Sequence, residues 1–393
     1  MAFLRRIDPD TLLRAGYSGM FFSLPLATSP TVICGVFVLI VWILSGRFVA
    51  SIKAFYRSDL MLPVVIIASL PWIGLLYSPV PSYGLPIALK THYWLYAIAL
   101  ATLPDKEQQP DLIIRMFLAG LSVNSVISVL QFGGVIPLRK GLATGLLGGS
   151  SPHITYSLLL TTGILLASFY VLKSGSTRER LLYTALMVQY LFTIGYVGGR
   201  SGYLSLIVLS PFVVYNIMGQ KHIMKILAVS VIAVSLLFVS PVIRSRFMQA
   251  KEDIVHYREG NSNTSLGLRF QMWGIAASEI RKNPLTGIGT GGFRKSWEDH
   301  KEDPSLPFHD HPHNSFLHMM VSYGIIGLAA FCYLLFLLLK KGWRGRHSAP
   351  GFSVFAFTAV FIIGSLSDTQ VLTFATATAF SLITGRSEVI HAS

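Results

Sequence analysis

The sequence predicts an all-α polytopic membrane protein with about twelve transmembrane helices and one large external loop that contains helices. Of its 393 residues, 52% are hydrophobic and only 13% are charged, whereas soluble domains have about 25% charged residues. Apolar stretches of roughly 16 to 22 residues recur along the chain, close to the roughly 20 that cross a bilayer. The short alternating segments of membrane β-barrels do not occur, and helices satisfy their own backbone in lipid. These observations exclude an ordinary soluble enzyme.

The apolar runs divide the chain into three parts. Residues 1–240 carry nine expected helices, 241–313 form the large loop, and 314–393 carry three more helices and a tail. Serine and proline interrupt the first run, which is the weakest of the twelve patterns. The expected spans lie near residues 15–28, 31–46, 60–77, 84–103, 112–133, 153–172, 181–197, 201–218, 223–240, 314–339, 351–366 and 369–384.

The basic residues predict the orientation. Loops on the N-terminal side of the spans hold seventeen Lys or Arg, whereas the short loops opposite hold three, Arg139, Lys140 and Arg200. Because positive charge favours the cytoplasmic side, we expect both termini to be cytoplasmic. No small-residue cleavage site follows the first basic residues, so the first helix should stay uncleaved. The net charge of +14 therefore indicates contact with membrane lipid head groups and not with nucleic acid.

The loop 241–313 breaks this charge pattern, with ten Lys or Arg and nine Asp or Glu. Long loops cross the membrane regardless of charge, so it is expected to be extracytoplasmic. The two cysteines, Cys34 and Cys332, lie in expected spans and are interpreted as small apolar residues, not as a disulfide.

Within this loop, the residues from about 266 to 282 are expected to form a helix, after the capping residues 263–265 and before Pro284. Arg269 lies on a face that is otherwise apolar, formed by Met272, Trp273, Ala276 and Ile280. One interpretation is that the arginine extends its head group into water. The other is that it points from an apolar, membrane-facing surface at a fixed anion, since an unpaired charge there is costly.

A glycine-rich run follows at residues 284–293. Its glycines resemble a phosphate cradle, but no βαβ unit surrounds them and no Gly-Lys-Ser sequence follows. A tight turn that allows close backbone approach is the favoured interpretation.

Three histidines, His309, His311 and His313, occupy alternate positions just before the tenth span. If extended, they would share one side and suit a metal, yet no second cluster supplies further ligands, so we expect no metal and no cofactor. A solvated loop is another alternative. The favoured role is a general base, because an unperturbed histidine titrates near neutral pH. His313 is preferred, since it lies where the loop meets the membrane.

Further ionisable residues lie near the same side. Arg200 sits between glycines, which would let a bulky group approach, although a lone arginine at a helix end is often an interfacial anchor. Lys90 and His92 lie toward the outer end of the fourth span and His318 lies one turn into the tenth. Ionisable groups within spans are candidates for function, although Lys90 could extend to the interface instead. Arg115 is interpreted as an anchor.

The order of these motifs resembles the O-antigen ligase and polymerase superfamily. The motifs are Gly-Gly-Arg-Ser-Gly at 198–202, Arg269 with Trp273, the run 284–293, His-Pro-His-Asn-Ser-Phe at 311–316, and Tyr-Gly-Ile-Ile-Gly at 323–327. The resemblance implies transfer of a preassembled glycan from undecaprenyl pyrophosphate to an acceptor hydroxyl, without a required metal.

The resemblance also implies roles for residues. Arg200 and Arg269 would bind the donor pyrophosphate and His313 would be catalytic, with His311, Asn314, Lys90 and His92 as supporting candidates. A pyrophosphate leaving group needs cationic, multi-donor stabilisation, which guanidinium groups supply.

Among the activities of the superfamily, the lipopolysaccharide O-antigen ligase is expected, with lipid A-core as acceptor. Polymerases of this superfamily commonly have two large periplasmic loops, and protein O-oligosaccharyltransferases generally carry an additional C-terminal region. Both stay open as alternatives. A transporter of an anionic lipid or solute is an alternative from another class, because twelve spans are a common transporter plan.

Overall fold

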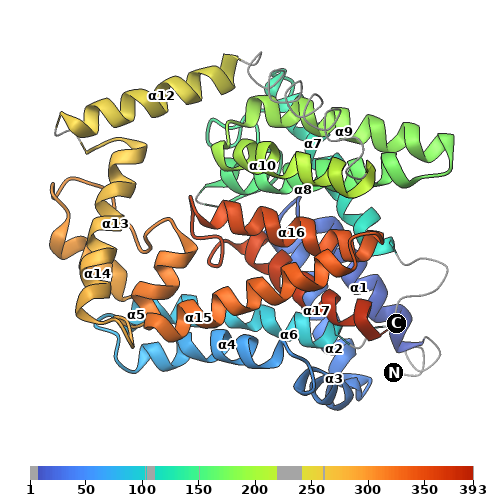
Figure 1. Ribbon diagram of the computed structural model, residues 1–393, viewed down its shortest axis with the longest axis horizontal. Coiled ribbons are helices and arrows are strands. Elements are labelled where there is room, and N and C mark those ends of the chain that lie inside the picture. Colours follow the sequence, from blue (N-terminus) through green and yellow to red (C-terminus); the bar gives the residue numbers. More distant parts are fainter. Residues whose placement is uncertain are drawn as a thin grey trace.

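The computed structural model describes residues 8–101, 103, 111–149, 151–218, 241–259 and 262–392. Regular secondary structure in this part of the chain is helical, which confirms the all-α prediction. Helices α1 (Pro9–Ser23) and α17 (Phe374–Ala392) lie toward one end of the molecule, and α13 (Ser265–Lys282) and α14 (Gly292–His300) lie at the opposite end (Figure 1). The ninth expected span, 223–240, falls outside the described residues.

Three described helices are long and apolar enough to cross a membrane: α7 (Leu112–Phe132), α8 (Pro152–Lys173) and α15 (Ser315–Arg344). A fourth candidate is the pair α2 (Thr28–Leu44) and α3 (Arg47–Tyr56), bent by 98°. Shorter apolar helices are α4 (Met61–Leu75), α16 (Ala349–Ser365) and the first part of α10 (Arg200–Met218). The chain is thus a multi-pass membrane protein, while the expected number of twelve spans is not confirmed.

Several expected boundaries are wrong. The first helix, α1 (Pro9–Ser23), starts earlier than expected because Asp8 caps it and Pro9 occupies its first turn. The segment after α2, expected to be a loop, forms α3 after Gly46 turns the chain at φ 71°.

The expected span 84–103 is also broken, into α5 (Pro81–Leu89), the 3-10 turn η2 (Lys90–His92) and α6 (Tyr93–Leu100). The Thr91 hydroxyl donates to the Ala88 carbonyl at 2.7 Å, a local bond that competes with regular helix geometry. This break places Lys90 beside a cavity, as described below.

The last helix, α17 (Phe374–Ala392), begins five residues after the expected start of the twelfth span. Residues 366–373 instead form an irregular connection after α16, in which the backbone N–H of Asp368 still bonds to the Gly364 carbonyl. The connection carries Asp368, whose carboxylate faces the segment 309–313, which we call the histidine loop.

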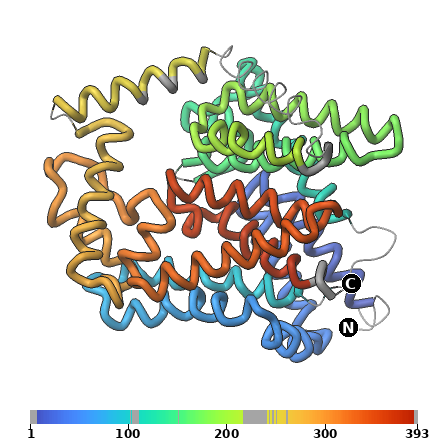
Figure 2. The backbone as a smooth tube through the Cα atoms, viewed as in Figure 1, coloured from blue at the N-terminus to red at the C-terminus, as the bar shows by residue number. Residues whose placement is uncertain are grey.

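Helix α8 lies at the centre of the largest core cluster. In its most apolar window, 89% of the residues are buried inside the protein, and α8 packs against α9 (Thr177–Val197), α10 and α16. A helix that is apolar on all sides is stable when protein surrounds it. Figure 2 shows α15 and α16 running through the middle of the molecule.

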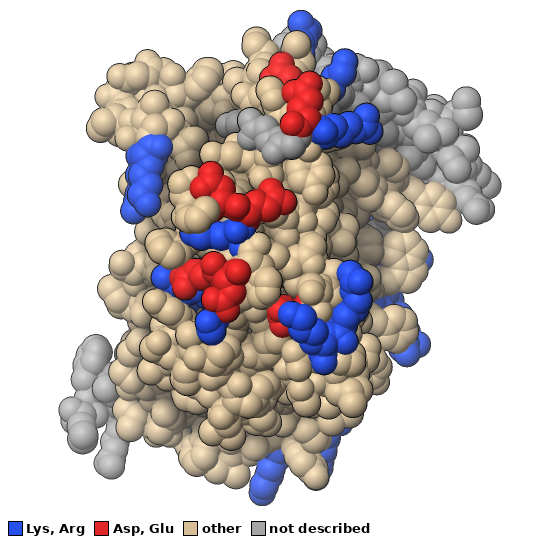
Figure 3. Space-filling model, turned by 90° about the vertical axis from the view of Figure 1, so that its left-hand side faces the viewer, with Lys and Arg blue, Asp and Glu red and all other residues tan. Residues whose placement is uncertain are grey.

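The end opposite the termini is built by α12 (Pro241–Arg258), α13 and α14. Charged side chains of both signs lie across this end (Figure 3). Helix α13 confirms the expected helix, with the Thr264 hydroxyl accepting the Gly267 N–H at 3.1 Å.

The apolar face of α13 was expected to face the membrane. In the structure it packs on protein instead. Met272 and Ala276 are buried with residues of α14, α15 and the following loop, namely Phe293, Trp297, Leu306 and Val321. Burying this face fixes the histidine loop against α15.

The glycine-rich run forms the expected tight turn. Ile288 and Gly289 donate their N–H groups to the carbonyls of Val321 and Ser322, at 2.9 and 3.0 Å, where α15 is interrupted. Gly324 makes the interruption with φ 63° and ψ −161°, a conformation that favours glycine. The turn therefore docks into a break in α15, nine residues after the first residue of that helix.

Candidate active site

Two tryptophans hold the histidine loop in place. The Trp297 indole N–H donates to the Pro307 carbonyl, and the Trp273 indole N–H donates to the Pro312 carbonyl, both at 3.0 Å. Trp297 projects from α14 and Trp273 from α13. The backbone on either side of His309 and His311 is therefore fixed by side chains that are themselves packed.

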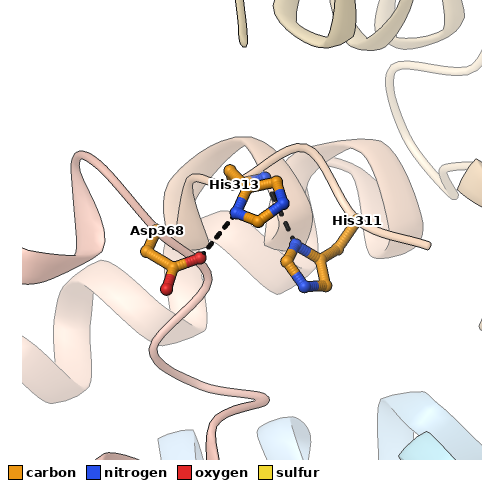
Figure 4. A group of neighbouring side chains, drawn as sticks. All are labelled: His311, His313 and Asp368. Atoms are coloured by element: carbon orange, nitrogen blue, oxygen red, sulfur yellow. Dashed lines mark hydrogen bonds and ion pairs between the residues drawn. The ribbon is translucent and has the colours of Figure 1, made fainter. Parts of the chain in front are cut away.

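His313 lies at the end of this loop in a strained conformation. Its φ of 48° is in the left-handed region, which residues other than glycine seldom adopt. Its Nδ1 lies 2.8 Å from Oδ1 of Asp368, and its backbone N–H donates to His311 Nδ1 at 3.3 Å (Figure 4). Strain of this kind persists only where the surroundings hold it, and it is frequent at functional sites.

Asp368 comes from the connection between α16 and α17, and only 3% of it is exposed. Its carboxylate also accepts the Thr369 N–H at 2.8 Å. Burial alone would raise its pKa, but the hydrogen bond and charge of His313, the nearby His311 and the Thr369 N–H together lower it. The ionised carboxylate accepts a hydrogen bond from Nδ1 of His313, an arrangement that leaves Nε2 as the nitrogen that can act as a base.

Asn314, next in the chain, has a structural place. Its side-chain oxygen accepts the N–H groups of Phe316 and Leu317 at 2.9 and 3.0 Å and so caps α15. Its amide donates to the Leu366 carbonyl at 3.1 Å. The cap fixes the start of α15 and the connection that carries Asp368 in one arrangement.

His309 and His311 are held neutral at physiological pH. Burial lowers the pKa of each to about 4, and repulsion from His313 adds to the shift. Neutral imidazoles offer both a donor and an acceptor to a polar ligand.

These histidines line a cavity of about 540 Å³, which we call the histidine cavity. It is bounded by the histidine loop, the start of α8, the end of α5 and the start of α17. Its polar lining residues include Lys90, Ser151, Thr155, His309, Asp310, His311, His313 and Thr373.

A second cavity of about 330 Å³, the arginine cavity, contains Arg200 and Arg269. It also contains Ser367, the neighbour of Asp368 in the chain. Burial lowers the pKa of Arg269, the like charge of Arg200 lowers it further, and Asp368 and Asp253 oppose the shift. An arginine stays protonated even so, and the two guanidinium groups therefore make this cavity electropositive.

Three helices begin at the arginine cavity. The first residues of α8, α10 and α13 line it, including His153, Ser201 and Ser265. Helix N-termini carry partial positive charge and favour anions. Arg200 also forms an ion pair of 3.8 Å with Asp253 of α12. The structure thus brings together the two arginines that the sequence analysis selected, in a setting suited to an anion.

The supporting candidates separate into two groups. Lys90 lies in η2 and lines the histidine cavity, where its Nζ donates to the Leu372 carbonyl at 2.6 Å. His92 does not line that cavity; its Nδ1 lies 2.7 Å from the Leu89 carbonyl and its ring packs on Tyr93. His318 is buried within α15, 2% exposed. Lys90 and His311 therefore accompany His313, and His92 does not.

Metal binding can be tested on the donor set. Among the described residues, one group has metal-type ligands within 4.8 Å of one another, and it consists of His311, His313 and Asp368, without His309. This set differs from the three-histidine alternative of the sequence. Nδ1 of His313 and Nδ1 of His311 are both engaged in hydrogen bonds, and a zinc site needs free lone pairs. The expectation of a metal-free site stays a prediction.

Comparison with known proteins adds an independent observation. Residues 182–332 match the family model described as O-Antigen ligase. The superfamily resemblance is confirmed. The matched segment contains Arg200, Arg269 and His313.

Three curated relatives are similar to this chain, and two of them are named as polysaccharide ligases. An uncharacterised protein of Haemophilus influenzae is 29% identical over 47% of this chain and 48% of its own length. A "Putative polysaccharide ligase" of Rickettsia conorii is 25% identical over 53% of this chain and 51% of its own length. A "Putative polysaccharide ligase" of Rickettsia bellii is 29% identical over 27% of this chain and 28% of its own length. The chain spans about half the length of the first two relatives, and less of the third.

Sequence reasoning missed Asp368. The residue lies 55 positions after His313 and beyond the matched segment. A weak signal existed, because Asp368 is the single acidic residue between Asp310 and Glu388. It lies in the short connection between the expected spans 351–366 and 369–384, and an acidic residue beside membrane spans is a candidate for function. Only the fold brings it to His313.

Proposed function

We propose that this chain is an O-antigen ligase that moves a preassembled glycan from undecaprenyl pyrophosphate to a hydroxyl of lipid A-core on the periplasmic side of the inner membrane. The family match and the polysaccharide-ligase relatives support the general activity. The observation that carries the proposal is the His313–Asp368 pair at 2.8 Å, beside a cavity with two arginines.

The proposed reaction is a single displacement. Nε2 of His313 takes the proton of the acceptor hydroxyl while its oxygen attacks the anomeric carbon of the donor glycan. The bond from that carbon to the pyrophosphate oxygen breaks, and the undecaprenyl pyrophosphate leaves with the electron pair. The anomeric carbon is inverted, and the proton on His313 is afterwards released to water.

Each charged group has a share in this reaction. Asp368 orients the His313 ring and stabilises the imidazolium that forms. Arg200 and Arg269 offer paired N–H donors to the pyrophosphate oxygens, where negative charge develops as the bond breaks. No metal and no cofactor has a step in this proposal.

The test is a reconstituted transfer. Purified protein in detergent is given undecaprenyl-pyrophosphate-linked glycan and lipid A-core, with and without a chelator, and the product is detected by its slower migration on a gel. We expect product in both conditions, and a rate about 10²- to 10⁴-fold lower in His313→Ala, the usual effect of removing a general base. Arg200→Lys and Arg269→Lys should also slow transfer, since lysine lacks the bidentate fork.

Other outcomes separate the alternatives. A lengthened donor without product on lipid A-core would indicate a polymerase, and glycan on protein a protein O-oligosaccharyltransferase. No covalent product with either acceptor would indicate the transporter, because detergent removes any gradient. Full activity of the His313→Ala variant would exclude His313 as the base. Activity that is lost with a chelator and restored by zinc would overturn the proposal that the reaction needs no metal.

A further inference from the structure

His313 faces a cavity that the proposed donor chemistry leaves unused. The histidine cavity, about 540 Å³, and the arginine cavity, about 330 Å³, share no lining residue. Ser367 lines the second, and its neighbour Asp368 bonds to His313, which lines the first. The His313–Asp368 pair therefore stands between the two cavities.

This separation matches the stereochemistry of a displacement. In a single displacement the attacking hydroxyl and the leaving group stand on opposite faces of the anomeric carbon. If the leaving pyrophosphate occupies the arginine cavity, the hydroxyl has to come from the side of the base. That side is the histidine cavity.

The lining of the histidine cavity suits a saccharide. Neutral His309 can donate and accept hydrogen bonds. Neutral His311, whose Nδ1 accepts the His313 N–H, can donate through Nε2, and the Asp310 carboxylate can accept from hydroxyls. Its volume falls within the usual range of about 300–1,000 Å³ for ligand cavities.

Lys90 gives the histidine cavity a positive charge, which favours a ligand with an anionic group. It is the single Lys or Arg among the described residues that line this cavity. One of its three N–H donors bonds to the Leu372 carbonyl, which leaves two for a ligand. The Asp310 side chain is 63% exposed, so water screens its charge more than that of the half-buried ammonium.

We propose that the histidine cavity binds the acceptor saccharide and that Lys90 contacts an anionic group of it, a phosphate or a carboxylate. This inference rests on the proposed function and adds the location of the acceptor and the property by which it is recognised. Lys90 is a specificity residue in this arrangement and takes no part in the chemical step.

The experiment measures KM and kcat for the acceptor with saturating donor. Three acceptors are compared: intact lipid A-core, the same acceptor after phosphatase treatment of the core, and the same acceptor with its carboxylates reduced. Lys90→Gln should raise KM for the intact acceptor roughly 10- to 100-fold, the effect of losing a charge-assisted hydrogen bond. The modified acceptor that lacks the recognised group should bind parent and variant alike, which identifies the group.

Matched variants complete the design. Lys90→Arg should keep most of the affinity, and Lys140→Gln, which changes an exposed lysine of an outer loop, should behave like the parent protein. The inference would be overturned if Lys90→Gln raised KM equally for all three acceptors, or if it changed KM for the donor instead. A parent protein that makes no product would instead count against the proposed function.

Discussion

Asp368 is the residue whose position changes the chemistry of the site most. A histidine in the loop alone could present either nitrogen to a substrate. With its Nδ1 bonded to a carboxylate that is 3% exposed, His313 presents Nε2 in a fixed direction and tautomer. The pair therefore turns one of three neighbouring histidines into the candidate base.

We expect Asp368→Asn to lower kcat about 10²- to 10⁴-fold with little change in KM for either substrate, because the amide favours the wrong tautomer. The ionisation of Asp368 itself should add no pH dependence to this effect from pH 6 to 8. The interactions with His313 hold the pKa of Asp368 below its ordinary value, so the parent carboxylate is ionised throughout that range.

The control for this variant is Asp299→Asn, an exposed carboxylate of α14 that pairs with Lys295. It should keep the parent kcat. If Asp368→Asn also kept the parent kcat while folding normally, the pair would have no part in the reaction.

Among the elements, the turn at 284–291 determines where α13 and α14 can sit. Thr290 donates its backbone N–H to the Gly74 carbonyl at 3.1 Å and its hydroxyl to the Pro71 carbonyl at 2.7 Å. The same turn enters the break of α15 at Gly324. The outer helices are thereby attached to α4 and α15, and through the tryptophans to the histidine loop.

Gly289→Ala should destabilise the protein by about 1–3 kcal/mol, measured as a fall of several degrees in Tm. Gly289 has φ 81°, and an added Cβ would lie 2.6 Å from the Gly74 carbonyl oxygen. The transfer rate should fall as well, because the turn supports the histidine loop.

Gly274→Ala is the matched control, since this glycine lies within α13 and a Cβ there meets nothing within 4 Å. It should be neutral or stabilise the protein by up to about 1 kcal/mol. Equal Tm values for the two variants would show that the turn is not a rigid attachment.

In the whole molecule, the charged end built by α12, α13 and α14 lies opposite the end that holds α1 and α17 (Figure 1). The basic residues of the sequence predict that the termini face the cytoplasm. If so, both cavities open toward the periplasmic half, where lipid-borne donor and acceptor can reach them.

Single cysteines test this orientation in a Cys34→Ala, Cys332→Ala background. We expect a cysteine at the exposed Ser305 to react with a membrane-impermeant thiol reagent in intact spheroplasts, and a cysteine at the exposed Arg178 to react only after lysis. The reverse pattern would invert the topology and contradict a periplasmic site.

The sequence by itself determined the helical membrane class, helix α13, the tight glycine turn and the short list of ionisable residues. These features depend on local pattern: apolar run length, a capping threonine and glycine spacing. Arg200, Arg269 and His313 were selected as candidates because each stands in a recognisable motif, and their roles stay predictions.

The tertiary structure alone decided which of these residues meet. Asp368 and Lys90 reach the histidine loop because the connection after α16 and the break between α5 and α6 are irregular, and hydropathy favours continuous helices there. The face of α13 packs on protein because α14 and α15 cover it, which no periodicity can reveal. Contacts between residues 55 or more positions apart depend on how helices pack, and a single sequence does not encode that in any local pattern.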